Sequence, residues 1–199
     1  MKAETISWTG QSVERVEDAA LLTGRGRFID DLGIRPGTLH AAILRSPHAH
    51  ADILSIGTGA AAALPGVVAI VTGRDVARLT TPMVAGLKIA AENWPMAVER
   101  VRYVGEPVAI AVAENRYLAE DALDAIEVTY QPLQAVVDPV ASMAEEAPIL
   151  HEKAGANLVS DRRFRYGEPE PAFAAAAHTI SVSIAYPRNT GAPMETFGV

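Results

Sequence analysis

The stretch at residues 101–113, VRYVGEPVAIAVA, decides the fold because its second half is apolar at every position. A strand has this composition when both of its faces are covered. Gly105 permits a tight turn just before the apolar run. Pro107 is tolerable as the first residue of a strand, where its missing N–H does no harm. The sequence therefore predicts a turn followed by a buried strand over residues 107–113.

A helix and a second strand are predicted directly after this run. Asn115 is a plausible N-cap, because its side-chain oxygen can accept a backbone N–H of the first turn. Three- and four-residue spacing then places four apolar side chains on one helical face: Leu118, Ala122, Ala125 and Ile126. From residue 126 to residue 130 the apolar period changes to two, which indicates a strand. The resulting unit is strand, helix, strand.

Other elements are predicted on both sides of this unit. Before it, strands are expected at residues 39–44, 53–56 and 67–71, and short helices at 58–63, capped by Thr58, and at 75–79. Residues 80–95 lack a clear period and are expected to form a long loop. After it, residues 132–149 are expected to form a surface connection. Further strands are predicted at 157–166 and 179–186, with a brief helix at 173–177.

Composition excludes several classes of protein. The chain has 199 residues, of which 49% are hydrophobic and 21% are charged, as in an ordinary folded domain. A net charge of -7 argues against nucleic-acid binding, which needs a basic surface. No cysteine occurs, so disulfides, iron–sulfur ligation and thiolate-bound zinc are excluded. We expect a cytoplasmic protein without a membrane span, since no apolar run approaches the roughly 20 residues that a bilayer requires.

Two short motifs suggest ligand binding, and both are better explained as local structure. Residues 24–27, GRGR, lack the third glycine of a dinucleotide fingerprint and are predicted to be a turn with exposed arginines. His48, His50 and Asp52 share one face of an extended segment, which is the minimum for a zinc site. Pro47 disfavours a regular strand there. We therefore predict a structural loop whose histidines bond the backbone, and no metal site.

Two glutamates are candidates for a functional role. Glu106 stands in the turn before the buried strand and either faces a partner surface or active-site funnel, or is a simple acidic turn residue. Glu195 lies seven residues after Arg188, whose charge would lower the glutamate's pKa and make it a structural anchor rather than a base. We assign neither residue a catalytic role.

Three blocks, taken in order, resemble a known family. They are residues 22–31 (LTGRGRFIDD), 45–51 (RSPHAHA) and 101–113. Their order and separation are similar to the start of the molybdenum-binding large subunit of the xanthine dehydrogenase, aldehyde oxidase and aerobic carbon monoxide dehydrogenase family. The final residues 193–199, PMETFGV, resemble the segment that leads into that subunit's cofactor-binding region.

The resemblance implies an α+β fold. Residues 1–14 are expected to be an N-terminal arm, and residues 15–150 an α/β-hammerhead domain with a mixed sheet and packed helices. Residues 151–199 would begin the molybdopterin-binding domain. We expect a domain interface at six positions: Gly105, Glu106, Pro107, Arg188, Met194 and Glu195.

The resemblance also implies a function for the complete subunit. It would oxidise or hydroxylate an aldehyde, a heteroaromatic ring or carbon monoxide, using oxygen derived from water and a molybdopterin cytosine dinucleotide cofactor. Iron–sulfur and FAD subunits would be its partners, together with the remainder of the molybdenum subunit. We expect this chain alone to bind no cofactor, to be inactive and to self-associate through its apolar end. The alternative is a free-standing, non-catalytic interaction domain with the same fold.

Overall fold

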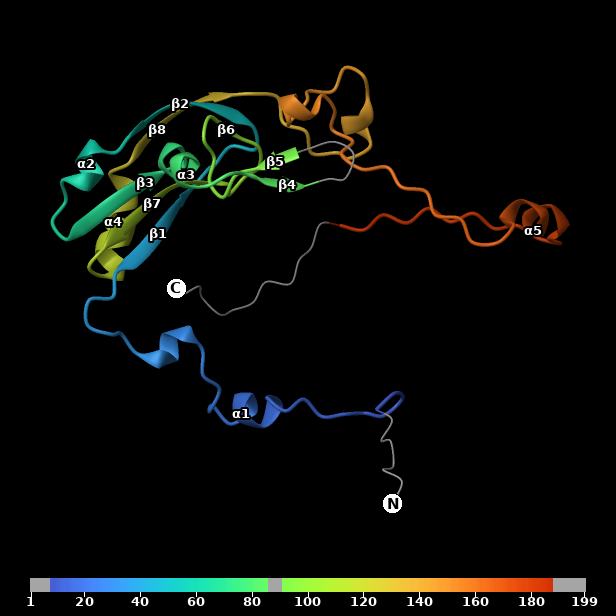
Figure 1. Cartoon of the computed structure of the whole chain (residues 1–199), viewed down its shortest axis with the longest axis horizontal. Helices are drawn as coiled ribbons and strands as arrows, with labels where there is room; N and C mark the ends of the chain where they lie inside the picture. Colours follow the sequence, from blue (N-terminus) through green and yellow to red (C-terminus); the bar gives the residue numbers. More distant parts are fainter. Residues whose placement is uncertain (1–7, 86–90, 188–199) are drawn as a thin grey trace. The chain divides into compact units, whose positions relative to one another are not determined.

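The apolar run becomes the central strand of a three-stranded sheet. In the computed structural model, which describes residues 8–85 and 91–187, β7 (Pro107–Ala113) pairs with β1 (His40–Arg45) on one side and β3 (Val67–Thr72) on the other (Figure 1). Both pairs are antiparallel. Four of the seven residues of β7 are buried, as expected for a strand with neighbours on each side. The strands predicted at 39–44, 67–71 and 107–113 are confirmed to within about a residue.

A second sheet forms around β2 (Ala51–Gly57). It pairs with β6 (Arg100–Val101) and with β8 (Glu127–Pro132), again antiparallel. The alternating pattern after residue 126 is thus a strand, as predicted. The α+β class is also confirmed, with one refinement to the expected mixed sheet. Every strand pair in the described part of the chain is antiparallel, and β7 and β8 lie in different sheets.

Helix α4 (Arg116–Asp124) packs on β1 and β7. Its start is fixed as predicted, because Asn115 Oδ1 accepts the Leu118 N–H at 3.0 Å. Ala119 and Ala122 are its buried residues. Ala122 clusters with the fully buried Ala109 and Ala111 of the strand, and such small side chains let the helix approach the sheet closely.

Two shorter helices follow strands β2 and β3. The first, α2 (Gly59–Ala62), has Thr58 at its N-cap position, but the Thr58 side chain makes no capping hydrogen bond. The second, α3 (Gly73–Leu79), has a reciprocal cap. Thr72 donates its backbone N–H and its hydroxyl to Asp75 Oδ2, at 3.0 and 2.6 Å, and the Asp75 backbone N–H donates to the Thr72 side chain in return. Both helices were predicted near these positions.

The core consists of two hydrophobic clusters. One joins the second sheet to the start of β7 and contains Ala51, Ile53, Ala97, Val101 and Val108. The other lies between α4, α2 and the first sheet and contains Ala61, Ala109, Ala111, Ala122 and Ile126. Ile56 and Val128 pack against both clusters, so the two sheets share one interior.

Three predictions about secondary structure are wrong. Residues 80–95 contain the paired strands β4 (Met83–Ala85) and β5 (Ala91–Asn93) instead of only a loop. Three-residue strands are too short to display a period. Residues 157–166 and 179–186 form no strand, and the described residues provide no strand that pairs with either segment. An alternating pattern forms a sheet only where a neighbour takes up its hydrogen bonds.

Between β8 and residue 187 the chain has little regular structure, as predicted for residues 132–149. Two single-turn 3-10 helices occur, η2 (Ala141–Met143) and η3 (Glu152–Ala154). The last helix of the described residues, α5 (Pro169–Ala175), begins four residues earlier than predicted because Pro169 suits the first helical position.

The chain divides into two units, residues 37–179 and residues 1–36 with 180–199. In the latter, the described residues form α1 (Asp18–Leu22) and η1 (Ile29–Leu32), neither of which contains a buried residue. Gly24 has a positive φ, consistent with the turn predicted at residues 24–27. The boundaries proposed at residues 14 and 150 stay predictions. Among the described helices, none has the length and apolarity required to span a bilayer.

Candidate functional site

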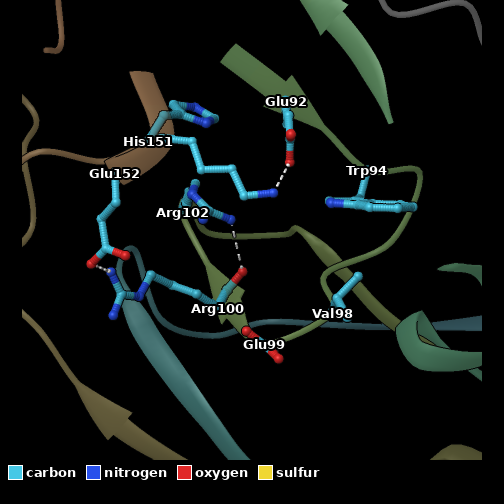
Figure 2. A pocket seen from close by; sticks show the side chains of 9 residues that line it. Glu92, Trp94, Val98, Glu99, Arg100, Arg102, His151 and Glu152 are labelled. Atoms are coloured by element: carbon cyan, nitrogen blue, oxygen red, sulfur yellow. Dashed lines mark hydrogen bonds and ion pairs between the residues drawn. The ribbon is translucent and has the colours of Figure 1, made fainter. Parts of the chain in front are cut away.

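A cleft opens where the ends of β5 and β6 meet the segment at residues 150–154. It has a volume of about 280 Å³, and an adjoining cavity of about 90 Å³ extends it toward Glu106. Figure 2 shows Trp94 on one side, His151 and Glu152 on the other, and Arg100 and Arg102 between them. The cleft is lined by Glu92, Trp94, Val98, Glu99, Arg100, Arg102, His151, Glu152 and Lys153.

Arg100 joins strand β2 to the segment at residues 150–154. Its Nε lies 2.5 Å from Asp52 Oδ1, and its NH1 lies 2.6 Å from Glu152 Oε1. Arg100 and Asp52 are only 20% and 32% exposed, so this pair is screened less than a surface pair, whereas the Glu152 side chain is 72% exposed. The hydrogen bond to Asp52 is the main reason that the pKa of Arg100 is raised.

Arg102 and Lys153 complete the attachment of the same segment. Arg102 Nε donates to the carbonyl of Leu150 at 2.7 Å, and its NH1 donates to the carbonyl of Arg100 at 3.3 Å. Lys153 Nζ lies 2.8 Å from Glu92 Oε2 on β5. Burial, and then the nearby charge of Arg102, lower the pKa of His151. Residues 150–153 are therefore held against the ends of β5 and β6 by three separate side chains.

Asn157 closes the loop that carries this segment, and sequence reasoning did not single it out. Its Oδ1 accepts the Leu150 N–H at 2.9 Å, while its Nδ2 donates to the carbonyls of Pro148 and Ser142 at 2.9 and 3.0 Å. One half-buried amide thus replaces the backbone bonds that a regular element would supply.

We expect Asn157→Ala to lower the free energy of unfolding by about 2 kcal/mol, because three hydrogen bonds are lost at a half-buried position. Hydrogen–deuterium exchange should show faster exchange at the Leu150 amide. Asn157→Asp keeps the acceptor but places a charge beside two carbonyls, so it should not restore stability. An unchanged Leu150 exchange rate in Asn157→Ala would contradict this role.

Glu106 is directed into the protein. It is 7% exposed, and its Oε2 accepts the backbone N–H of Arg102. Its main-chain carbonyl accepts the Ser46 N–H at 2.9 Å. Burial raises the pKa of Glu106, and the bond from Arg102 and that residue's charge oppose the shift only in part. In this chain the Glu106 side chain supports the turn from inside, and its role at a domain interface stays a prediction.

The other predicted interface residues near Glu106 lie in the same turn. Gly105 adopts a φ of +89°, and its carbonyl accepts a bond from the Arg45 guanidinium at 2.9 Å. The carbonyl of Pro107 accepts the Ala97 N–H at 2.8 Å. Tyr103 and Val104, which the sequence did not single out, are 56% and 64% exposed at the tip. Arg188, Met194 and Glu195 lie outside the described residues.

The raised pKa of Glu106 has a measurable consequence for stability. The folded chain favours the protonated acid, so the stabilisation is fully present below the ordinary pKa of 4.5 and is lost as the pH rises through the folded pKa. Glu106→Gln stays neutral and can still accept the Arg102 N–H. Its unfolding free energy should therefore increase relative to wild type as the pH is raised above about 4.5. Urea titrations from pH 4 to 8 test this, and a constant difference would contradict it.

The residues of the histidine motif make structural contacts. His50 Nδ1 donates to the carbonyl of Gln134 at 2.8 Å, and the His48 ring packs edge-on against Tyr130 with centroids 4.9 Å apart. Asp52 forms an ion pair with Arg100. Within residues 8–85 and 91–187, no group of three or more histidine or carboxylate side chains is arranged to hold a metal. The prediction of histidines bonded to the backbone is confirmed for His50.

The cleft does not fit the molybdopterin cofactor that the resemblance implies. A phosphate-bearing pterin needs donors directed at it. Here Arg100 and Lys153 are engaged by carboxylates, and Arg102 by backbone carbonyls. The arrangement is that of a structural junction rather than a cofactor site.

Known proteins resemble this chain along most of its length. The family described as aldehyde oxidase and xanthine dehydrogenase, a/b hammerhead domain, matches residues 23–134. The nicotine 6-hydroxylase large subunit of Paenarthrobacter nicotinovorans is 39% identical, over 95% of this chain and 23% of its own length. The carbon monoxide dehydrogenase large chain of Hydrogenophaga pseudoflava is 37% identical, over 92% of this chain and 24% of its own.

A solved structure agrees with these relatives. Quinoline 2-oxidoreductase from Pseudomonas putida 86 superposes with a TM-score of 0.71 at 42% identity, covering 85% of this chain and 22% of that one. The chain thus spans about a quarter of the length of the relatives it matches. With the family's sequence pattern covering residues 23–134, and with the two sheets and helix α4 in place, the chain belongs to the aldehyde oxidase and xanthine dehydrogenase family and corresponds to a hammerhead-bearing portion of its large subunits.

Proposed function

We propose that this chain is the N-terminal portion of the large subunit of a molybdenum hydroxylase. The observation that carries the proposal is the asymmetry of the alignments, in which 95% of this chain corresponds to 23% of the nicotine 6-hydroxylase large subunit. Residues 15–150 would then be the hammerhead domain. Residues 151–199 would begin the cofactor-binding domain, to which the anchored segment at 150–153 leads.

The complete subunit would oxidise or hydroxylate an aldehyde, a heteroaromatic ring or carbon monoxide. The names of the relatives support this range, since they refer to nicotine, carbon monoxide and xanthine, and one is called a molybdenum-binding subunit. The cofactor in the proposal is molybdopterin cytosine dinucleotide, held by the part of the subunit outside this chain. Relatives are named as subunits of complexes, and the partners proposed here are iron–sulfur and FAD subunits.

The role of this chain is structural in the proposal. Its junction of Arg100, Arg102 and Lys153 would fix the direction in which the polypeptide leaves the hammerhead domain. The turn at Gly105, Glu106 and Pro107, with Arg188, Met194 and Glu195, would contribute to the domain interface. The chain alone would therefore neither turn over substrate nor retain molybdenum.

Reconstitution tests this proposal. The nicotine 6-hydroxylase large subunit, with the matched quarter removed, is co-expressed with this chain and with the partner subunits of that enzyme. We expect the chain to co-purify with the truncated subunit, and molybdenum to appear in the assembled complex by elemental analysis. Stoichiometric molybdenum on this chain alone, or no association with the truncated subunit, would contradict the proposal.

The interaction-domain alternative is favoured by one observation, which is that the buried residues of both core clusters all lie within residues 51–126 of this chain. An independent module should be monodisperse. A portion of a larger subunit should self-associate through exposed apolar residues, among them Ile180, Val182, Ile184 and Tyr186, which are 68–87% exposed. Sedimentation velocity over a range of concentrations separates the two.

A further inference from the structure

The two faces of the first sheet differ sharply in how they are covered. The face toward α4 carries Ala109 and Ala111, both fully buried. Strand register places six apolar residues on the opposite face, here called the outer face, in two rows: Ala41–Val112–Ala69 and Ile43–Ile110–Val71. Ile43 is 39% exposed, Ala41 is exposed, and the other four are only half-buried.

The large apolar side chains of the central strand are fully buried only at its start. Val108 is fully buried in the cluster with Ala97 and Val101, at the point where the register between β1 and β7 shifts. Two and four residues further on, Ile110 and Val112 are only half-buried although they occupy the middle strand. Isoleucine and valine at the centre of a sheet are normally covered by a second layer.

The chemistry of the outer face identifies the kind of contact it makes. None of its six residues is charged or polar, whereas transient interfaces carry polar and charged groups in normal surface proportion. Permanent interfaces resemble a divided domain core. Three-quarters of the length of the nicotine 6-hydroxylase large subunit lies outside the match to this chain.

We propose that the outer face is the docking surface for an apolar element of the remaining portion of the same large subunit. This rests on the proposed function above. The contact buries the two rows and completes the second layer over β7. It is permanent, and it forms as the subunit folds.

The test uses one variant on the outer face and one matched control. Ile43→Lys lies on edge strand β1 at an exposed position, so the isolated chain should fold with an unchanged circular dichroism spectrum and melting temperature within a few degrees. Tyr117→Lys, 77% exposed on α4, introduces the same charge away from the outer face. Both are co-expressed with the nicotine 6-hydroxylase large subunit lacking its matched quarter.

We expect Ile43→Lys to weaken co-purification at least tenfold, because the new ammonium group is buried without a partner, and Tyr117→Lys to change it less than twofold. Because the chain has no cysteine, Ile43→Cys provides a second measurement. Its thiol should react at least tenfold more slowly with maleimide in the complex than in the isolated chain, while Tyr117→Cys reacts equally in both.

The outcomes separate the two proposals. If the wild-type chain fails to associate with the truncated subunit, the proposed function falls and this inference falls with it. If the wild type associates and Ile43→Lys associates equally well, or Ile43→Cys stays reactive in the complex, only the assignment of the outer face is overturned.

Discussion

Gly73→Ala should lower the free energy of unfolding by about 3 kcal/mol or more, the upper end of the range for overpacking a core. Gly73 is the first residue of α3 and is buried. A Cβ built on it would lie 1.9 Å from the carbonyl oxygen of Ala97 and 2.6 Å from the carbonyl carbon. The obstacle is backbone rather than a flexible side chain, so it cannot rotate away.

Removing this clash would require the backbone around Ala97 to move, and other contacts fix that backbone in place. Its N–H donates to the carbonyl of Pro107 at 2.8 Å, and its side chain is buried in the cluster with Val101 and Val108. Displacing this segment would therefore disturb the start of β7 and the cluster together. The close contact between Gly73 and the Ala97 backbone therefore supports the start of β7 as well as helix α3.

Gly59→Ala is the matched control, because Gly59 is likewise the first residue of its helix, α2. A Cβ there meets nothing within 4 Å. Alanine should be neutral or stabilise the chain by up to about 1 kcal/mol, since it restricts the unfolded chain more than glycine does. Urea unfolding of both variants provides the comparison. If the unfolding free energy of Gly73→Ala were within about 1 kcal/mol of the wild-type value, the backbone around Ala97 would have to move at little cost, which would contradict the prediction.

The sequence predicted the first sheet well because its strands are long and apolar. Residues 107–113 have no polar side chain, which is typical of a strand that is buried on both faces of its sheet. Asn115 was predictable for a different reason, since it stands directly between that run and a helical period. In both cases the signal is local.

The junction could not be predicted because its contacts join distant residues. Arg100 meets partners 48 residues earlier, at Asp52, and 52 residues later, at Glu152. Nothing in the spacing of such charges indicates that they pair. The same holds for Lys153 and Glu92, which are 61 residues apart.

Glu106 shows how a turn can be located while the direction of its side chain stays open. Glycine and proline on either side of it indicated a turn before a strand. Whether the Glu106 carboxylate faces solvent depends on the backbone of residues 102–106. This backbone turns back on itself, so that the Arg102 N–H donates to the carboxylate. The exposed side chains of that turn are those of Tyr103 and Val104 instead.

Val108→Ala should lower the unfolding free energy of the isolated chain by about 2–3 kcal/mol. Val101 and Val108 are the largest fully buried side chains of the described residues. Truncation removes apolar surface worth about 0.8 kcal/mol per methylene-sized group and leaves a cavity among residues that cannot close it. Circular dichroism followed through urea unfolding measures the loss.

Val112→Ala makes the same chemical change on the same strand, four residues further on. Because Val112 is only half-buried, the cost in the isolated chain should be about 1 kcal/mol or less. In the assembled large subunit, where the outer face is proposed to be covered, Val108→Ala and Val112→Ala should lower the unfolding free energy by similar amounts. If Val112→Ala already cost the isolated chain as much as Val108→Ala, the outer face would have to be covered within these 199 residues, and no further layer would be needed.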